Sequence, residues 1–160
     1  AGMDSIARAL PQIVAQNPDV QIVYPLHRNP NVRQVMEQAL GGAERIHLLP
    51  PLDYLPFVQL MAASTLILSD SGGVQEEAPS LGVPALVLRE TTERPEAVAA
   101  GAVHLVGLDE ANIVREANLL LQDRVAHEKM AVAINPYGDG HASARIVSVL
   151  LGEDWEEFRS

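Results

Sequence analysis

The sequence predicts an α/β domain with a parallel sheet that helices cover on both faces, in a three-layer αβα arrangement. Five short apolar segments alternate along the chain with segments that have helical periodicity and capping residues. The apolar segments run almost without interruption, which is typical of strands buried on both faces of a sheet. The chain has 160 residues, 48% of them hydrophobic, and this suits one domain with a substantial core.

The first part of the chain alternates helix and strand. An amphipathic helix opens it and ends at Asn17-Pro18, because the residue before a proline is disfavoured in the helical conformation. Asn31 and Asp53 precede segments of helical periodicity, so we expect both to be N-caps. The expected helices cover residues 3–16, 32–40 and 54–63, and the expected strands cover residues 20–26 and 45–49.

The second part continues the same alternation. An apolar strand leads into a glycine turn and a helix, which ends at Gly82. Pro95 suits the first position of a short helix because proline has no amide hydrogen to leave unpaired, and Asp109 suits an N-cap. The expected strands cover residues 66–68, 83–88 and 102–106, and the expected helices cover 74–82, a short segment from 95, 110–121, a continuation to 133, and 141–151.

Composition excludes several kinds of partner. The formal net charge of -10 gives phosphate backbones no long-range attraction, so we expect no nucleic-acid partner. No apolar run approaches the roughly 18 residues of a membrane span, so we expect no membrane partner. The absence of cysteine excludes disulfides and thiolate metal sites and is compatible with a cytoplasmic protein. The histidines are not spaced with acidic residues as metal ligands, so we expect neither a metal nor a cofactor.

The turn Ser71-Gly72-Gly73 is the first sign of a ligand site. It joins a strand to a helix, where backbone amides and the helix dipole can bind an anion such as phosphate. Glu76 and Glu77 lie one turn into that helix, where a carboxylate can accept hydrogen bonds from the hydroxyls of an attached sugar. The simpler alternative is a capped helix with acidic residues near its positive end.

Arg94 extends this site to a second loop. Open α/β sheets bind ligands beyond the carboxyl ends of their strands, and Arg94 follows such an end. The turn, Glu77 and Arg94 together predict a site for a nucleotide diphosphate. His27 also follows a strand, but its position also suits an ordinary surface histidine. Asp139 lies between two glycines and is most simply a turn residue. The alternative for the arginines is ordinary surface pairing of Arg28, Arg89 and Arg94 with Glu90, Glu93 and Glu96.

A set of loop sequences in this chain is distinctive: His27-Arg28-Asn29-Pro30-Asn31-Val32, Asp53-Tyr54-Leu55-Pro56-Phe57, Asp70-Ser71-Gly72-Gly73-Val74-Gln75-Glu76-Glu77-Ala78-Pro79, Thr91-Thr92-Glu93-Arg94-Pro95-Glu96 and Asn135-Pro136-Tyr137-Gly138-Asp139-Gly140. In this order, over nearly the whole chain, they closely resemble the non-hydrolysing UDP-N-acetylglucosamine 2-epimerases. The resemblance implies a Rossmann-like domain, the carboxyl-terminal half of a two-domain GT-B fold. The start of the chain in a helix, with no strand before it, is what we expect of a fragment whose amino-terminal domain is missing.

The resemblance implies roles for the residues of the predicted site. In the family, the residues that match Ser71 and Gly72 hold the diphosphate. Gly73 belongs to the same turn, so we expect its amide to contribute as well. The position of Glu77 holds the ribose hydroxyls, and that of Arg94 reaches the region between phosphate and sugar. UDP-N-acetylglucosamine and UDP are therefore the implied ligands.

Other positions concern the base and regulation. The backbone around Phe57 is expected to lie against the uracil, and His27 near a second, regulatory UDP-N-acetylglucosamine. Leu52 departs from the family, because many members carry glutamine there, so a side-chain hydrogen bond to the base is lost. The family's His-Arg-Arg-Glu segment and its catalytic carboxylates are absent from this chain, so no catalytic residue is assigned.

The function expected from these observations is that of a UDP-binding domain, residues 1–152, followed by an acidic tail at residues 153–160. The parent enzyme is expected to be a homodimeric isomerase that interconverts UDP-N-acetylglucosamine and UDP-N-acetylmannosamine by eliminating UDP and adding it back, through a 2-acetamidoglucal. The chain alone is expected to be inactive. In the tail, Trp155 and Phe158 favour packing over a disordered end.

Three alternatives remain open from the sequence. A GT-B glycosyltransferase would use the same domain to hold a sugar donor, and a hydrolysing relative would release free UDP and N-acetylmannosamine. A receiver-like signalling module would need an acidic cluster after the first strand, where Tyr24-Pro25-Leu26-His27 has none.

Overall fold

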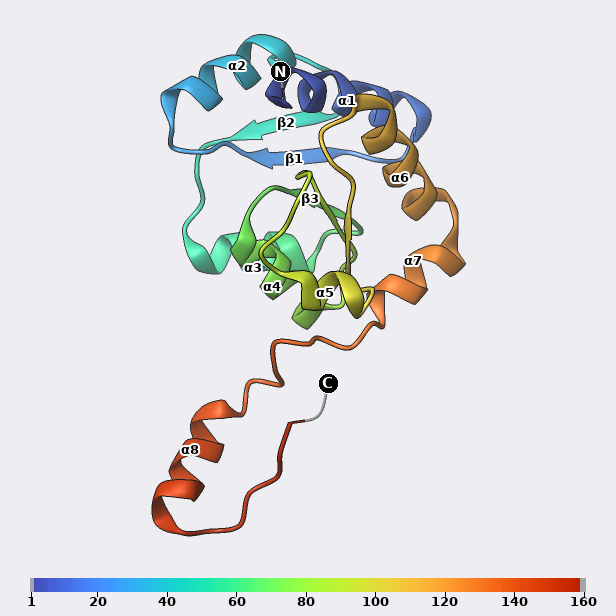
Figure 1. Ribbon diagram of the computed structural model, residues 1–160. Helices are drawn as coiled ribbons and strands as arrows, with labels where there is room; N and C mark the ends of the chain where they lie inside the picture. The colour runs from blue at the N-terminus through green and yellow to red at the C-terminus, as the bar shows by residue number, and fades with distance from the viewer. Residues whose placement is uncertain (1, 159–160) are drawn as a thin grey trace.

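The computed structural model describes residues 2–158 (Figure 1). Helices and strands alternate along the chain as the sequence predicts, and most boundaries agree within two residues. The elements are α1 Gly2–Gln16, β1 Ile22–Pro25, α2 Pro30–Leu40, β2 Ile46–Leu49, α3 Tyr54–Ala62, β3 Ile67–Ser69, α4 Gly72–Glu77, the 3-10 helix η1 Ala78–Leu81, β4 Ala85–Val87, α5 Pro95–Ala99, β5 Val103–Leu105, α6 Glu110–Gln122, α7 Arg124–Ala131 and α8 Ala142–Leu151.

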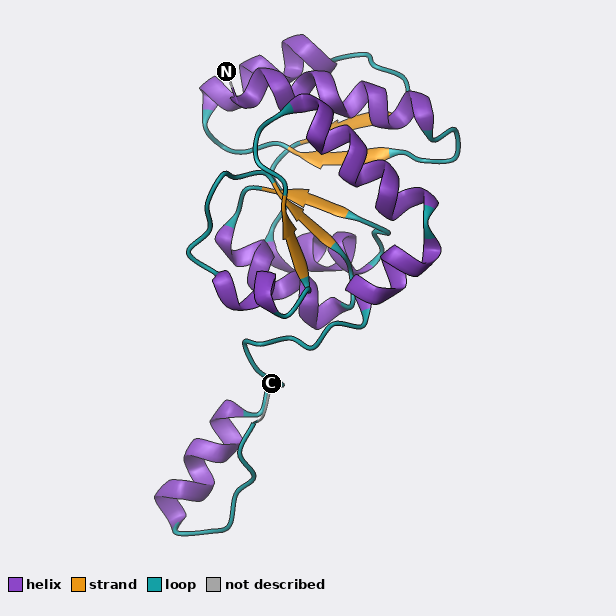
Figure 2. Cartoon of the chain, turned by 45° about the vertical axis from the view of Figure 1, so that its right-hand side comes forward, coloured by secondary structure: helices purple, strands orange, loops and turns teal. Residues whose placement is uncertain are grey.

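The strands lie at the centre of the molecule and every pairing is parallel (Figure 2). β1 pairs with β2, and β4 lies between β3 and β5, with Leu86 opposite both Leu68 and His104. The α/β class is therefore confirmed. One detail differs, because the described strands form two hydrogen-bonded sets where the sequence predicts one sheet. Figure 2 shows the two sets turned relative to each other, as expected of short strands that twist.

The strand β4 separates two apolar cores. Leu86 and Leu88 face a large core formed mainly with α1, α2 and α6, whereas Ala85 and Val87 face a smaller core with η1, α5 and β5. Successive residues of a strand point to opposite faces, and here a core covers each face. All four side chains are therefore buried. The unbroken apolar run in the sequence is the signature of this two-sided burial.

Two helix starts differ from the sequence prediction. Asn29, not Asn31, is the N-cap of α2: its side chain accepts a hydrogen bond from Asn31 N, and Pro30 takes the first helical turn. The helix after the glycine turn begins at Gly72 rather than at residue 74. It continues as a 3-10 turn and ends at Gly82, whose left-handed backbone closes it. The two glycines are therefore part of the helix, which places their amides in its first turn.

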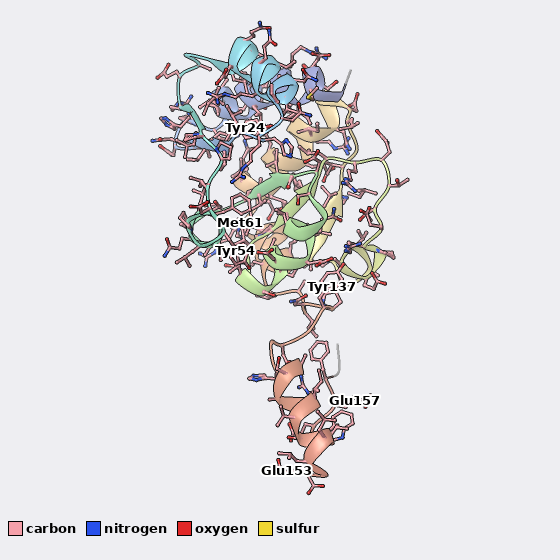
Figure 3. The ribbon with its side chains drawn as sticks, turned by 90° about the vertical axis from the view of Figure 1, so that its left-hand side faces the viewer. Tyr24, Tyr54, Met61, Tyr137, Glu153 and Glu157 are labelled. Carbon is pink, nitrogen blue, oxygen red and sulfur yellow. The ribbon has the colours of Figure 1, made fainter. Side chains whose placement is uncertain are left out.

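The last helix, α8, extends away from the α/β body (Figures 1 and 3). Asp139 accepts two hydrogen bonds from the guanidinium of Arg145, at 2.7 and 2.6 Å, and Arg145 Nε donates to Glu156 O at 2.6 Å. The tail thus returns along the helix, and Phe158 is half-buried whereas Trp155 is 52% exposed. Residues 159 and 160 of the predicted tail lie outside the described residues. In the part of the chain that the structure describes, no helix has the length and hydropathy to cross a membrane.

Candidate functional site

The glycine turn follows the carboxyl end of β3. Ser71 is the N-cap of α4, as predicted, and its backbone is extended. Within the described chain its side chain makes no capping hydrogen bond; instead Ser71 N donates to Ser69 Oγ at 3.1 Å. The amides of the first helical turn therefore point outward from the strand end without an intrahelical acceptor, as in any helix N-terminus.

Four side chains surround the two glycines. A side-chain carbon built on Gly72 would lie 3.9 Å from Arg94 Nη2 and 3.8 Å from Glu93 Oε1. A side-chain carbon built on Gly73 would lie 3.8 Å from Ser71 Oγ and 3.9 Å from Glu77 Oε1. The structure thus brings together the residues that the sequence singled out for a diphosphate and a sugar: Ser71, Gly72, Gly73, Glu77 and Arg94.

Arg94 is the N-cap of α5 and turns back over α4. Its Nε donates to Glu76 Oε1, and its Nη1 donates to Glu93 O at 3.3 Å. The hydrogen bond and charge of Glu76 raise the pKa of Arg94. The sequence alternative of local surface pairs holds for Arg89, which binds Glu93 at 2.9 Å. For Arg94 the side-chain partner is Glu76 on another element, and sequence reasoning missed this pair.

Helix α3 approaches the same site from the other side of α4. The Tyr54 phenol lies close enough to Glu77 for this carboxylate to raise the pKa of the phenol, through hydrogen bonding and through its charge. Tyr54 is 70% exposed. Phe57 is half-buried one turn later in the same helix, and Leu52 is half-buried in the loop before it. The contact between Tyr54 and Glu77 is a second feature that the sequence pattern did not reveal.

A buried amide joins α4 to the loop before α5. Gln75 is fully buried; its Oε1 accepts a hydrogen bond from Thr92 Oγ1 at 2.6 Å, and its Nε2 donates to Ser71 O at 3.3 Å. The Thr92 hydroxyl also accepts from Arg94 N at 3.0 Å. Gln75 and Thr92 are 17 positions apart in the sequence, so no local spacing rule could have predicted this bond.

The loop at residues 135–140 also reaches this region. Asn135 Nδ2 donates to Ser80 Oγ at 2.6 Å, next to η1. Tyr137 lies close enough to Arg94 for their charges to interact, although burial is the main reason that the pKa of its phenol is raised. Figure 3 shows Tyr137 at the junction between the α/β body and α8.

His27 stands apart from the gathered residues. It is exposed in the loop between β1 and α2, where its Nδ1 accepts a hydrogen bond from Asn29 N at 3.0 Å. Among residues 2–158, no group of three or more histidine and acidic side chains is placed to hold a metal ion. The donors at the site are amides and a guanidinium, which suit an anionic ligand.

A parallel α/β fold with this glycine turn and arginine at the carboxyl edge of its strands defines a domain of the GT-B-like class. The chain belongs to the UDP-N-acetylglucosamine 2-epimerase family, which it matches over residues 1–151. The UDP-N-acetylglucosamine 2-epimerase of Salmonella typhimurium is 55% identical over 149 residues, which are 93% of this chain and 40% of the relative. The Bacillus subtilis enzyme of the same name is 53% identical over 149 residues, 93% of this chain and 39% of the relative.

Solved structures agree with this assignment. The UDP-GlcNAc 2-epimerase of Neisseria meningitidis, bound to UDP-GlcNAc, superimposes with a TM-score of 0.88 at 51% identity, over 95% of this chain and 41% of that one. The Methanocaldococcus jannaschii enzyme, in complex with UDP-GlcNAc and UDP, superimposes with a TM-score of 0.77 at 32% identity. The match covers 94% of this chain and 41% of that one. The chain thus spans about 40% of the length of the relatives that it matches.

Proposed function

We propose that this chain is the UDP-binding, carboxyl-terminal domain of a UDP-N-acetylglucosamine 2-epimerase. The observation that carries the proposal is the approach of Arg94 Nη2 to the glycine turn, 3.9 Å from a side-chain carbon built on Gly72. A cation and a helix N-terminus on two sides of one small space suit a diphosphate. Two of the structural relatives hold UDP-GlcNAc, which supports the same ligand here.

In this proposal the residues around the turn bind different parts of the nucleotide. The amides of Ser71, Gly72 and Gly73 and the guanidinium of Arg94 hold the diphosphate. Glu77 accepts hydrogen bonds from the ribose hydroxyls, in place of its interaction with the Tyr54 phenol.

The uracil and the regulatory site lie outside this group. The backbone near Phe57 on α3 faces the uracil, and the half-buried Leu52 offers the base no hydrogen bond. His27, on the separate loop after β1, is the candidate for a second, regulatory nucleotide-sugar site.

The proposed reaction inverts C2 of the sugar. A base removes the C2 proton, the bond between C1 and the phosphate oxygen breaks with its electron pair on UDP, and a 2-acetamidoglucal remains. Protonation of C2 on the opposite face and return of UDP to C1 give UDP-N-acetylmannosamine. The amides at the turn and Arg94 stabilise the negative charge that grows on the departing diphosphate. We place the acid and base on an amino-terminal domain, so this chain alone is expected to be inactive.

Helix α8 supports the proposal of a partner domain. Much of its apolar surface is uncovered, and Leu150 is 79% exposed. A ten-residue helix of this kind gains most of its stability from packing, so a further surface is expected to cover it. We propose that the missing domain does so in a homodimeric, full-length enzyme. The exposed apolar residues are Ile146, Val147, Val149, Leu150 and Leu151.

Titration of the chain with UDP, followed by backbone amide chemical shifts, tests the binding proposal. We expect the largest shifts between Ser71 and Glu77, and much smaller shifts with uridine, which lacks the diphosphate. If UDP leaves these amides unshifted, the proposed binding site is wrong.

The activity is tested in the full-length enzyme with UDP-N-acetylglucosamine as sole substrate. An epimerase forms UDP-N-acetylmannosamine without an acceptor, whereas a glycosyltransferase needs one and a hydrolysing enzyme accumulates free UDP and N-acetylmannosamine. Arg94→Ala should depress turnover more than folding, because the guanidinium acts on the ligand and its surface ion pair adds little stability. Unchanged kinetics would remove the role assigned to Arg94.

A further inference from the structure

We propose that Gln75 and Thr92 are positioning residues that hold Arg94 over the nucleotide site. Neither residue is expected to touch the ligand. The inference rests on the proposed function, because it assumes that Arg94 binds the diphosphate. It adds two residues that act through the backbone of Arg94 rather than through the ligand.

The burial of Gln75 is the first observation. A primary amide in an apolar interior is costly unless its donors and acceptor are paired. Gln75 is fully buried, and both ends of its amide are used, the oxygen by Thr92 and the nitrogen by the carbonyl of Ser71. An apolar side chain would fill this position without that requirement. The amide therefore serves to fix the loop of Thr92 relative to the start of α4.

The Thr92 hydroxyl completes the connection. A hydroxyl has one donor and two acceptor positions, and here it donates to Gln75 and accepts from the backbone amide of Arg94. Hydrogen bonds thus run from the carbonyl of Ser71, the N-cap of α4, to the amide of Arg94, the N-cap of α5. These two caps are the two sides of the proposed diphosphate site.

The ion pair between Arg94 and Glu76 holds Arg94 in position less firmly than the hydrogen bonds through Thr92. This ion pair joins side chains that are 33% and 41% exposed, so salt and water screen it. The neighbouring ion pair between Arg89 and Glu93 also joins exposed side chains, within the same loop. The bond between Thr92 and Gln75 is partly buried, beside the fully buried Gln75, and it joins uncharged groups that salt does not screen. It is therefore the contact that keeps the Arg94 backbone in place at physiological ionic strength.

Thr92→Val and Thr92→Ser separate a positioning role from a merely structural one. Valine keeps the shape of threonine and loses the hydroxyl, whereas serine keeps the hydroxyl. In the 160-residue chain at physiological salt, we expect Thr92→Val to weaken UDP binding by about fivefold, and Thr92→Ser to stay within about twofold of the wild type. The same Thr92→Val chain should show the Arg94 Nε–H signal moved in its nitrogen–proton spectrum. Thr91→Val, in the exposed neighbouring position, is the matched control and should leave both readings unchanged.

Gln75→Met supplies a second arm. It removes both hydrogen bonds at similar volume, and combined with Thr92→Val it should weaken UDP binding no further than the more severe single variant, because both act on one connection. Additive losses, or UDP affinity in a folded Thr92→Val chain equal to that of the wild type, would overturn the positioning role. If the wild-type chain itself does not bind UDP, the proposed function fails instead.

Discussion

Arg94 Nε donates to Glu76 Oε1, and this pair joins the N-cap of α5 to the middle of α4. The contact leaves Nη2 of the same guanidinium facing Gly72. One side of the arginine is therefore held by a carboxylate, while the other side points to the amides of the turn. Because Glu76 is negative and close to the proposed diphosphate, it orients Arg94 but also offsets part of its charge.

Glu76→Gln should strengthen UDP binding. The glutamine oxygen can still accept the bond from Arg94, but the negative charge that repels a diphosphate is gone. We expect affinity about threefold higher at low ionic strength, and a smaller gain at high salt, as Coulomb interactions across a solvated site allow. Isothermal titration calorimetry at two salt concentrations measures this. Glu128→Gln on α7, which breaks the ion pair with Arg124 and changes the net charge equally, is the control. Weaker or unchanged binding by Glu76→Gln would contradict the offset.

Gly72→Ala should separate binding from folding. A methyl group at Gly72 meets atoms only at ordinary contact distances of 3.8 and 3.9 Å, and the substitution adds helix propensity. The melting temperature should therefore stay level or rise. The same methyl lies between the turn and Arg94, so UDP affinity should fall by about tenfold, because glycine here lets the backbone approach a pyrophosphate. Thermal unfolding and UDP titration on one sample measure both effects, and undiminished affinity would show that the ligand does not enter this space.

Glu77→Gln should lower the pKa of Tyr54. The carboxylate raises that pKa by accepting the phenol proton in a hydrogen bond and by repelling the phenolate, and glutamine keeps at most the first effect. Carbon-13 spectra of the tyrosine ring across alkaline pH follow the titration directly. Glu76→Gln is the control and should leave Tyr54 unchanged. Saturating UDP should also lower the pKa of Tyr54, because the ribose hydroxyls then occupy Glu77. If neither Glu77→Gln nor UDP changes the Tyr54 titration, the proposed interaction between Tyr54 and Glu77 is wrong.

Asp139 should make helix α8 sensitive to acid. The guanidinium of Arg145 and the amide of His141 hold the pKa of this carboxyl well below its usual range. A lowered pKa in the folded chain means that the stabilisation is fully present above the unfolded pKa of about 3.9 and is lost as pH falls towards the folded value. Amide shifts of α8 should therefore change below about pH 4.

Asp139→Asn is the matched variant for this titration. It removes the ionisable group while keeping an oxygen that can accept the His141 amide. Its α8 amides should show the altered shifts already at neutral pH and little further change in acid. If the wild type and Asp139→Asn titrate alike, other carboxylates govern the helix.

The pattern of the sequence contained the order of the elements and the place of the ligand site. Strands such as β4 were recognisable because burial on both faces demands an unbroken apolar run. The turn that begins α4 was recognisable because a capping serine and two glycines lie within a few residues of one another. The boundaries at Asn29 and Gly72 were less exact, since several neighbouring residues can cap a helix.

The connections within the site were decided by tertiary structure alone. Glu76 and Arg94 are 18 residues apart, and Gln75 and Thr92 are 17 apart, on elements that meet only because β3 and β4 pair in a fixed register. Chain spacing does not encode which acidic residue meets which arginine. By itself the sequence determined that a turn, an acid and an arginine share one edge of the fold. Packing around β4 decided that Glu76 holds Arg94 and that a buried glutamine fixes its loop, because side-chain partners depend on distances that only the folded backbone sets.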